Sequence, residues 1–311
     1  MAKKKDKHKS KDDHATSGKG KKGKKSKKDA VAPIETSFID TLKVGAGFVL
    51  ADRDPGSTPG FTGDKAKGKD ALAAADDELD LLQEQLYAMS REGGTKRVLL
   101  VIQGMDTSGK GGILRHVVGA VDPQGIELTA FKAPSPEELE HPFLWRIRKA
   151  LPGPGMIGVF DRSHYEDVLI VRVHNLVPPQ QWGRRYGTIN GFEQGLLDDD
   201  VTIIKVMLHV SKEEQKARLQ ERLDRPDKYW KYNPGDLDER AYWDAYQEAY
   251  QALLERCSPA HAPWYVVPAD HKWYARLAVQ RLLLEHLRGL DLRWPPADFD
   301  VEKEKARLAE L

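Results

Sequence analysis

The chain has 311 residues, of which 40% are hydrophobic and 31% are charged, so it can bury one sizeable core or a core with an appended lobe. No apolar run approaches the length needed to cross a bilayer, and no apolar segment follows the charged amino terminus as in a secretory signal. The single cysteine, Cys257, excludes an intramolecular disulfide and a cysteine-based zinc site. We therefore expect a soluble, cytoplasmic globular protein without a membrane partner, in which Cys257 packs in a helix.

The formal charge of +1 conceals two parts of opposite sign. Residues 1–30 contain 13 Lys and 4 Asp, a formal charge of +9, and subtracting this from +1 leaves −8 for the remainder. Because this Lys-rich tail has almost no apolar residues to bury, we expect it to be disordered. It either attracts a polyanion, such as nucleic acid, an inorganic polyanion or a membrane surface, or acts only as a solubilising extension.

Residues 31–95 are expected to form an N-terminal arm followed by one helix. Residues 31–69 include a loop rich in Gly, Pro and Asp and show too little periodicity for regular structure. From Asp70 to Arg91, apolar residues recur every three or four positions, which predicts a helix with one face on a core. These residues are Leu72, Ala75, Leu79, Leu82, Leu86 and Met89, and Gly93 and Gly94 end the helix.

Strand and helix patterns then alternate up to residue 290, and residues 291–311 form a C-terminal extension. The predicted strands are Arg97–Gln103, Glu127–Lys132, Met156–Phe160, Val201–Val210 and Trp264–Pro268, with helices starting at Lys110 and Pro136. This alternation predicts an α/β domain over residues 96–290, with a parallel sheet covered by helices on both faces. In such sheets ligands bind at the carboxyl ends of the strands, where the following motifs are found.

The segment RVLLVIQGMDTSGKGG (residues 97–112) joins the first strand to a helix through a glycine-bounded loop. Gly104, Gly109 and Gly111 allow backbone N–H groups to turn inward around phosphate oxygens. Lys110 adds a positive charge at the start of the helix. This combination predicts a phosphate-binding loop of the Walker A type. The alternative is a simple Gly-rich turn with a solvated Lys110.

The loop departs from the ordinary pattern at two positions. Gly111 stands where a Ser or Thr hydroxyl would contact magnesium, and Asp106 lies inside the loop. A carboxylate among phosphate oxygens repels them unless a divalent cation lies between, so Asp106 is predicted to bind Mg²⁺ directly or through water. Its alternative role is to orient or deprotonate an attacking phosphate.

A second site is predicted directly after the strand Met156–Phe160. Asp161 at the strand tip can hold magnesium through its waters, and Arg162 beside it can bridge a transferring phosphoryl group. Phosphoryl transfer needs positioning and charge neutralisation more than proton transfer, so we interpret His164 as structural or hydrogen-bonding.

Basic residues gather on the helix that Ser211 and Glu214 are predicted to start as a capping box. The cationic side chains share one face of this helix and continue beyond it: Arg218, Arg222, Arg225, Lys228 and Lys231. We interpret residues 212–240 as a flap that closes over phosphates and excludes water. The alternative is a solvated face paired with Glu221 and Asp224.

Two patterns near the end of the chain concern packing. Trp243, Tyr246 and Tyr250 follow helical spacing and are predicted to lie in the core rather than to stack on a base. Asp270 is predicted to cap the final helix, whose apolar residues include Leu277.

Four motifs in this order resemble the polyphosphate kinase 2 family, which moves phosphate between inorganic polyphosphate and nucleotides. They are GMDTSGKGG, FDRSHYEDVLIVRVHNLVP, LHVSKEEQKARLQERLDRPDKYWKYNPGDLDER and APWYVVPADHKWYAR, and the resemblance covers residues 34–290. It implies a three-layer P-loop kinase fold with a helical lid, magnesium dependence and a homo-oligomer. It also implies roles for six residues. Asp106 and Asp161 would be acidic residues of the metal site, and Lys110 and Arg162 would be phosphate ligands. Arg218 and Arg222 would belong to the lid.

The stretch from Ser163 to Asp167 is similar to the branch of the family that accepts AMP as well as ADP. Other branches have Trp and Asn at the positions of His164 and Glu166, so the resemblance places Glu166 at the nucleotide. The implied function is reversible transfer of a terminal phosphoryl group from polyphosphate to AMP or ADP, giving ADP or ATP. The alternatives are an ATP-dependent nucleotide kinase and a non-catalytic polyanion-binding protein. The Lys-rich tail departs from the family pattern and leaves its polyanion partner open.

Overall fold

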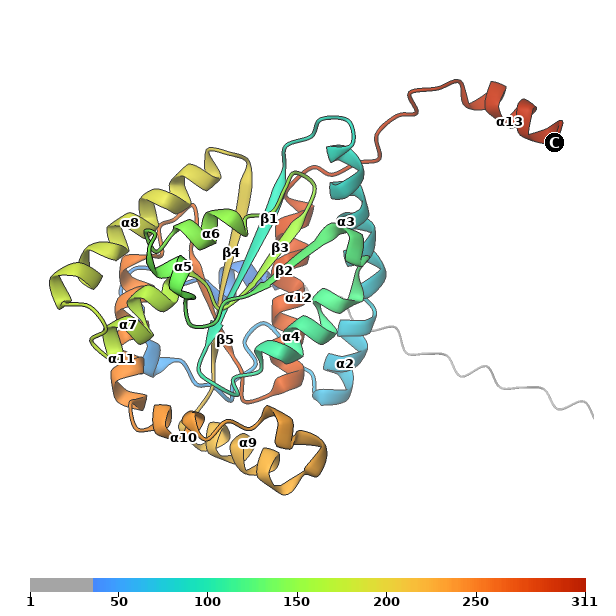
Figure 1. Ribbon diagram of the computed structural model, residues 1–311. Coiled ribbons are helices and arrows are strands. Elements are labelled where there is room, and N and C mark those ends of the chain that lie inside the picture. The colour runs from blue at the N-terminus through green and yellow to red at the C-terminus, as the bar shows by residue number, and fades with distance from the viewer. Residues whose placement is uncertain (1–35) are drawn as a thin grey trace, which may run out of the picture. The chain divides into compact units, whose positions relative to one another are not determined.

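The computed structural model describes residues 36–311, so the predicted Lys-rich tail lies outside the described residues. Five parallel strands form one sheet in the order β2-β3-β1-β4-β5 (Figure 1). Their bounds are β1 Arg97–Gly104, β2 Ile126–Ala130, β3 Ile157–Asp161, β4 Val201–His209 and β5 Trp264–Pro268. The predicted parallel sheet is confirmed, and every predicted strand overlaps its observed counterpart.

Both faces of the sheet are buried because side chains of each strand alternate between two apolar cores. In β1, Val98, Leu100 and Ile102 enter one core, whereas Leu99 and Val101 enter the other. A strand buried on both faces has a nearly continuous apolar sequence, which is why β1 and β4 were recognisable in the sequence.

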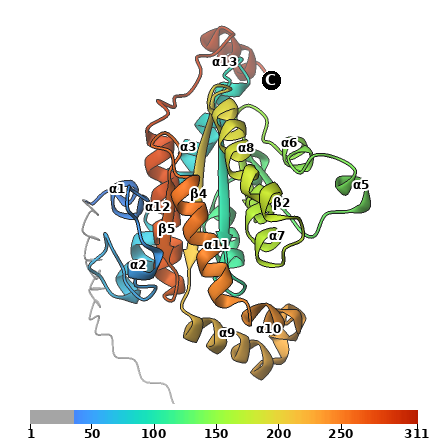
Figure 2. The ribbon, with the colours of Figure 1, turned by 90° about the vertical axis from the view of Figure 1, so that its left-hand side faces the viewer.

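Helices cover the two faces as separate layers, and Figure 2 shows the sheet between them. The first core is closed by α1 (Phe38–Leu42), α3 (Asp76–Ser90), α4 (Lys110–His116) and α12 (Lys272–Arg288). The second is closed by α6 (Trp145–Lys149), α8 (Pro179–Leu197) and α11 (Trp243–Arg256). Trp243, Tyr246 and Tyr250 of α11 lie in this second core, as predicted. The three-layer α/β arrangement is therefore confirmed.

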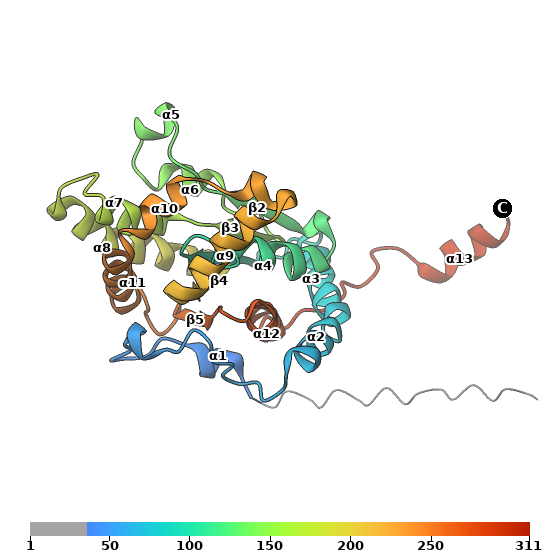
Figure 3. The ribbon, with the colours of Figure 1, turned by 90° about the horizontal axis from the view of Figure 1, so that it is seen from below.

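The remaining helices and 3₁₀ turns complete the described part of the chain. Their bounds are η1 Leu50–Asp52, α2 Lys65–Ala73, η2 Val118–Ala120, η3 Pro123–Gly125, α5 Pro136–Leu139, η4 His164–Val168, α7 Ile170–Val173, α9 Lys212–Asp224, η5 Pro226–Lys231, α10 Gly235–Arg240 and α13 Val301–Ala309. Seen from below, α9 lies across the end of the sheet (Figure 3). None of the helices in residues 36–311 combines the length and the apolar character that a membrane span requires.

The prediction that residues 31–69 lack regular structure is wrong. This segment contains α1 and the start of α2, and the single helix predicted from Asp70 to Arg91 is divided at Ala74 and Ala75 into α2 and α3. Phe38 of α1 is fully buried, and its backbone N–H donates to Glu285 Oε1 of α12 at 2.8 Å. Because these contacts come from the far end of the chain, local periodicity contains no signal for α1.

The prediction that Asp270 caps α12 is also wrong. The N-cap residue is His271, which makes no side-chain capping bond. Asp270 Oδ1 instead accepts a hydrogen bond from the backbone N–H of Ser211 at 2.8 Å. The Ser211 hydroxyl caps α9 by accepting from Glu214 N, but the Glu214 carboxylate pairs with Arg218, so half of the predicted capping box forms.

The sequence analysis assigned no helix to residues 179–197, where α8 is found. Four glycines, Gly183, Gly187, Gly191 and Gly195, recur along α8, and each lowers the intrinsic helix propensity. The helix forms because its opposite side buries Tyr186, Ile189, Phe192 and Leu196 against the second core. Packing against the sheet therefore determines this element.

Close packing of α2 on α12 gives a first prediction, at Gly68. A Cβ atom at this buried position would lie 2.3 Å from the Trp273 ring, so Gly68→Ala forces the two helices apart. We expect the overpacking to lower the free energy of unfolding by about 1–3 kcal/mol, despite the higher helix propensity of Ala.

Gly191→Ala in α8 is the matched control, because nothing lies within 4 Å of its added Cβ. This variant should raise the free energy of unfolding by about 0.5–1 kcal/mol. Urea denaturation of both variants measures the difference, and equal shifts of the same sign would contradict the packing described for Gly68.

Candidate active site

A cavity of about 520 Å³ opens at the carboxyl end of the sheet. Its walls come from the loop after β1, the start of α4, the end of β3, and the basic helix α9. Asp161 pairs in register with Ile102 of β1, so the tip of β3 lies beside the start of that loop. The sheet thus brings together the two motifs that the sequence places about fifty residues apart.

The loop from Gly104 to Lys110 has the backbone of a phosphate-binding loop. Gly104 and Gly109 have φ angles of +153° and +119°, and a Cβ at Gly104 would lie 2.8 Å from the Leu208 carbonyl oxygen. Helix α4 begins at Lys110, as predicted, and the Lys110 ammonium donates to the Gly104 carbonyl at 2.8 Å. Burial lowers the pKa of Lys110, and the nearby Asp106 carboxylate opposes this effect. The predicted alternative of a solvated Lys110 is wrong.

Asp106 and Arg162 form the contact that joins the two motifs. Arg162 Nη2 donates to Asp106 Oδ1 at 3.0 Å, and both side chains line the cavity. Arg162 has a φ of +64°, an unusual conformation for a residue with a side chain, and its backbone N–H donates to the Ile102 carbonyl. The left-handed turn directs the guanidinium toward the phosphate-binding loop.

Asp161 and Asp106 together fit a divalent cation. Asp161 Oδ1 is buried and has no hydrogen-bond partner within the protein, although it lines the cavity. A buried carboxylate oxygen needs a donor or a cation. No group of three or more His, Cys, Asp or Glu side chains within residues 36–311 is arranged to hold a metal. The donor set therefore suits a cation that keeps waters or takes substrate oxygens as its other ligands.

Glu166 lies beside these groups, in the 3₁₀ turn η4 that follows Arg162. Burial raises the pKa of Glu166, and the positive charges of Arg162 and Lys110 only partly offset the rise. The Gln103 side chain, oriented so that its oxygen accepts from Ser163, donates to Glu166 Oε1 at 3.0 Å. His164 is fully buried, does not line the cavity and lies 3.2 Å from Glu193, in agreement with its interpretation as a hydrogen-bonding residue.

Arg218 is built into the phosphate-binding loop. Only 4% of Arg218 is exposed, and its guanidinium donates to the carbonyl oxygens of Thr107, Ser108, Ala269 and Asp270 at 2.6–2.9 Å. The alternative of a solvated face is therefore wrong for Arg218, whereas it fits Arg225, whose side chain is 48% exposed and pairs with Glu221.

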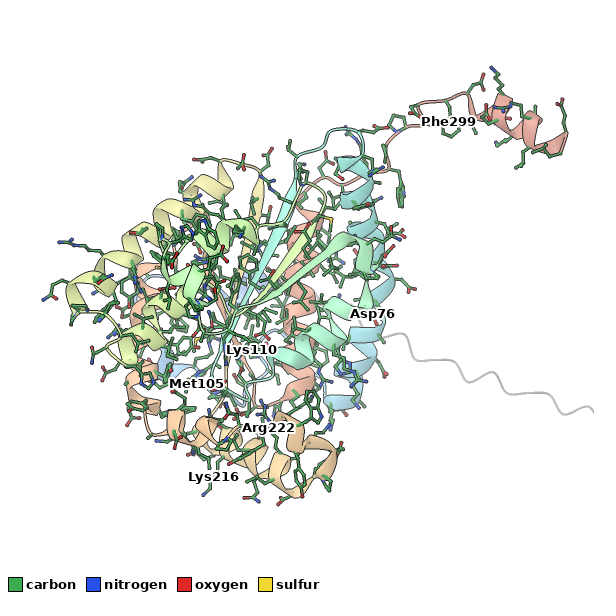
Figure 4. All side chains as sticks on the ribbon, viewed as in Figure 1. Asp76, Met105, Lys110, Lys216, Arg222 and Phe299 are labelled. Atoms are coloured by element: carbon green, nitrogen blue, oxygen red, sulfur yellow. The ribbon has the colours of Figure 1, made fainter. Side chains whose placement is uncertain are left out.

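Arg222, one turn further along α9, also lines the cavity. Its guanidinium donates to Asp236 of α10 and to the Lys231 carbonyl. Figure 4 shows Arg222 below Lys110.

Further cations line the same cavity without having been assigned a role in the sequence analysis: Arg115, Lys132, Lys272 and Arg276. Lys272 and Arg276 lie four residues apart in the first turns of α12, which places them on one helix face. In total, eleven Lys and Arg residues and three carboxylates, Asp106, Asp161 and Glu221, line the cavity. The sequence did contain a signal for two of these residues, because Lys272 and Arg276 lie four positions apart shortly after the strand Trp264–Pro268.

Comparison with known proteins identifies the family. The family model described as "Polyphosphate kinase 2 (PPK2)" matches residues 62–293. The chain belongs to the polyphosphate kinase 2 family. The family predicted from the four motifs is thereby confirmed, and membership implies that phosphoryl transfer depends on a divalent cation.

Several polyphosphate kinase 2 relatives align over most of the chain. The "AMP/ADP-polyphosphate phosphotransferase" of Meiothermus ruber is 46% identical over 82% of this chain and 94% of that protein. The "ADP-polyphosphate phosphotransferase" of Rhodopseudomonas palustris is 43% identical over 73% of this chain and 82% of that protein. The crystal structure of Polyphosphate Kinase 2 from Arthrobacter aurescens TC1 is similar with a TM-score of 0.88 and 58% identity, covering 90% of this chain and 99% of that one.

A second prediction concerns Arg218. Arg218→Lys keeps the charge but cannot serve four carbonyl oxygens at once, so the phosphate-binding loop loses its tie to the loop before α12. We expect the free energy of unfolding to fall by about 2–3 kcal/mol. Arg225→Lys, at an exposed position of the same helix, should change it by less than about 0.5 kcal/mol. Equal effects in urea denaturation would refute the bridging role.

A third prediction follows from the raised pKa of Glu166. Because the folded-state pKa lies above the unfolded value, this carboxyl favours folding most below the unfolded pKa of about 4.3, and that advantage is lost as the pH rises through the folded pKa. Glu166→Gln should therefore raise the free energy of unfolding relative to the wild type more at pH 7.5 than at pH 5. Denaturant titrations at both pH values test this, with the exposed Glu92→Gln as control. A pH-independent difference would contradict it.

Proposed function

We propose that this polyphosphate kinase 2 transfers a terminal phosphoryl group between inorganic polyphosphate and AMP or ADP, giving ADP or ATP. The observation that carries the proposal is the cavity lined by eleven Lys and Arg residues and three carboxylates around a phosphate-binding loop. The names of the relatives from Meiothermus ruber and Rhodopseudomonas palustris support the same activity. The stretch from Ser163 to Asp167 supports AMP as an acceptor beside ADP.

The excess of cations favours a polyphosphate donor over a nucleotide alone. Each internal phosphate of the polymer carries about one negative charge, so a chain of several phosphates can neutralise many cations along one cavity. The cations extend beyond the loop to Arg115 and Arg276 on one side and to Lys228 and Lys231 of η5 on another. A single nucleotide triphosphate has too few charges for this set, whereas an inorganic chain can contact all of it.

The proposed roles follow from position. Lys110 and Arg162 bind the phosphoryl group that moves, and Gly109 and Gly111 allow the backbone to approach phosphate oxygens. Gly104, which does not line the cavity, forms the turn that begins the loop. Arg218 fixes the loop, and Arg222 neutralises charge from the opposite wall. Glu166 does not itself line the cavity, and its proposed place near the acceptor nucleotide rests on its position beside Arg162 and Lys110. Asp106 and Asp161 would hold Mg²⁺, Asp161 through its unpartnered Oδ1, and the ion would supply positive charge against the mutual repulsion of the phosphate oxygens.

The chemistry proposed is direct in-line transfer between phosphate oxygens. The site aligns donor and acceptor and neutralises the charge on both, so no covalent intermediate on the protein is needed. Because the phosphoanhydride bond that breaks resembles the bond that forms, the reaction runs in both directions and follows the substrate concentrations.

The test is an assay that contains polyphosphate, AMP and MgCl₂ but no ATP. The proposal expects ADP first and ATP afterwards. An ATP-dependent nucleotide kinase would form neither product until ATP is added, and a non-catalytic polyanion-binding protein would form neither product under any condition.

The fourth prediction applies the same assay to variants. Asp106→Asn removes a charge from the metal site and Lys110→Met removes the ammonium in the loop, so each should lower kcat by about 10²–10³-fold. Asp199→Asn is the control, because Asp199 is exposed and pairs with Arg97 at the start of β1, away from the cavity. Turnover of the Asp106 or Lys110 variant close to that of the control would refute the assigned roles.

A further inference from the structure

A cluster of buried polar side chains lies behind the active site and takes no part in lining the cavity. It consists of His164 and Tyr165 from η4, Glu193 from α8 and Lys205 from β4. Each of the four is at most 2% exposed. Buried charges are expensive unless they are paired and fully hydrogen-bonded, so a cluster of this kind in the core calls for an explanation.

The cluster is built around one ion pair, and His164 Nδ1 is its one side-chain atom that is buried without a hydrogen-bond partner. The Lys205 ammonium donates to Glu193 Oε2 at 2.6 Å, to the Cys257 carbonyl at 2.8 Å and to the Tyr165 hydroxyl at 3.2 Å. All three of its protons are therefore used. These three bonds satisfy the Lys205 ammonium and the Oε2 atom of Glu193.

The second carboxylate oxygen of Glu193 serves η4. Glu193 Oε1 accepts from the Tyr165 hydroxyl at 2.6 Å and lies 3.2 Å from His164 Nε2. Two consecutive residues of η4 thus reach the same oxygen. The pKa of Glu193 agrees with this arrangement: burial raises it, but Lys205 and His164 outweigh burial and keep the carboxyl ionised.

These two residues follow directly after the segment that enters the cavity. Arg162 has a φ of +64°, which for a residue with a Cβ is a strained conformation that the surroundings must maintain. Toward the N-terminus it is held by β3 and by the bond from its own N–H to Ile102. Toward the C-terminus, the anchors are Ser163, whose hydroxyl donates to the Gln103 side-chain oxygen of β1, and then His164 and Tyr165 on Glu193.

We propose that Glu193 and Lys205 are positioning residues that hold the turn from Arg162 to Glu166 in place through His164 and Tyr165. Lys205 keeps Glu193 ionised and fixed, and Glu193 fixes the turn, so the strained Arg162 stays aimed at the phosphate-binding loop. Neither residue touches substrate. The inference rests on the proposed function, because the relevant output is the rate of phosphoryl transfer.

The experiment compares two double variants that both remove the buried ion pair. Glu193→Gln with Lys205→Met keeps an amide oxygen that accepts from His164 and Tyr165. Glu193→Met with Lys205→Met is similar in size but has no acceptor. We expect the Met/Met variant to have a kcat about 10–100-fold lower than the Gln/Met variant, because a small displacement of a catalytic group is enough for such a loss. The KM for polyphosphate, set by the other cations of the cavity, should differ by less than about twofold.

A second comparison separates positioning from general damage to the fold. Both double variants are repeated with Arg162→Ala, where the positioned group is absent. If the cluster acts through Arg162, the difference in kcat disappears in this background, because the two effects are then not additive. Equal kcat for the two double variants, or a difference that persists without Arg162, overturns the proposal.

Tyr165→Phe keeps the test decisive if the Met/Met variant does not fold. This change removes one donor to Glu193 and leaves the ion pair in place. We expect Tyr165→Phe to lower kcat when Arg162 is present and to leave kcat unchanged in the Arg162→Ala background. An unchanged kcat with Arg162 present, or a lowered kcat in the Arg162→Ala background, refutes the inference. Wild-type turnover of AMP with polyphosphate, run in parallel, separates failure of this inference from failure of the proposed function.

Discussion

The ion pair between Arg162 and Asp106 is the contact on which the site depends. It joins the loop after β1 to the turn after β3, whose strands lie side by side in register. An isolated pair at a partly exposed position contributes little to stability, so its importance is geometric. The left-handed Arg162, the buried Glu193 behind it and the glycines of the loop all serve to bring these two side chains to one place.

Two cations of the cavity are held mainly by neutral oxygens. The Lys110 ammonium is bound by the Gly104 carbonyl, and four further carbonyl oxygens, together with the Glu214 carboxylate, bind Arg218. A carbonyl fixes a side chain in place without cancelling its charge, whereas a salt bridge would do both. The positive field of the cavity therefore remains available for an anion, and the mutual repulsion of the cations is relieved when a polyanion binds.

The part of the fold that the sequence predicted is the part determined by local pattern. The apolar run of β1, the glycine loop and the start of α4 at Lys110 can be recognised from consecutive residues, and so can Asp161 at the tip of β3. Features set by distant partners had no such signal. Helix α1 depends on Glu285, Asp270 is taken by the backbone of Ser211, and Lys205 looks like an ordinary strand residue until Glu193 is placed beside it.

Side chains of α12 donate hydrogen bonds to backbone carbonyls of residues 59–72 in the N-terminal segment. The donors are Tyr274 to the Pro59 carbonyl, Gln280 to the Leu72 carbonyl and Arg281 to the Ala71 carbonyl. In addition, Gly68 of α2 packs against the Trp273 ring. The first turns of the same helix carry Lys272 and Arg276 into the cavity. A replacement in this remote segment that tilts α12 would therefore also displace two of the charges that line the cavity.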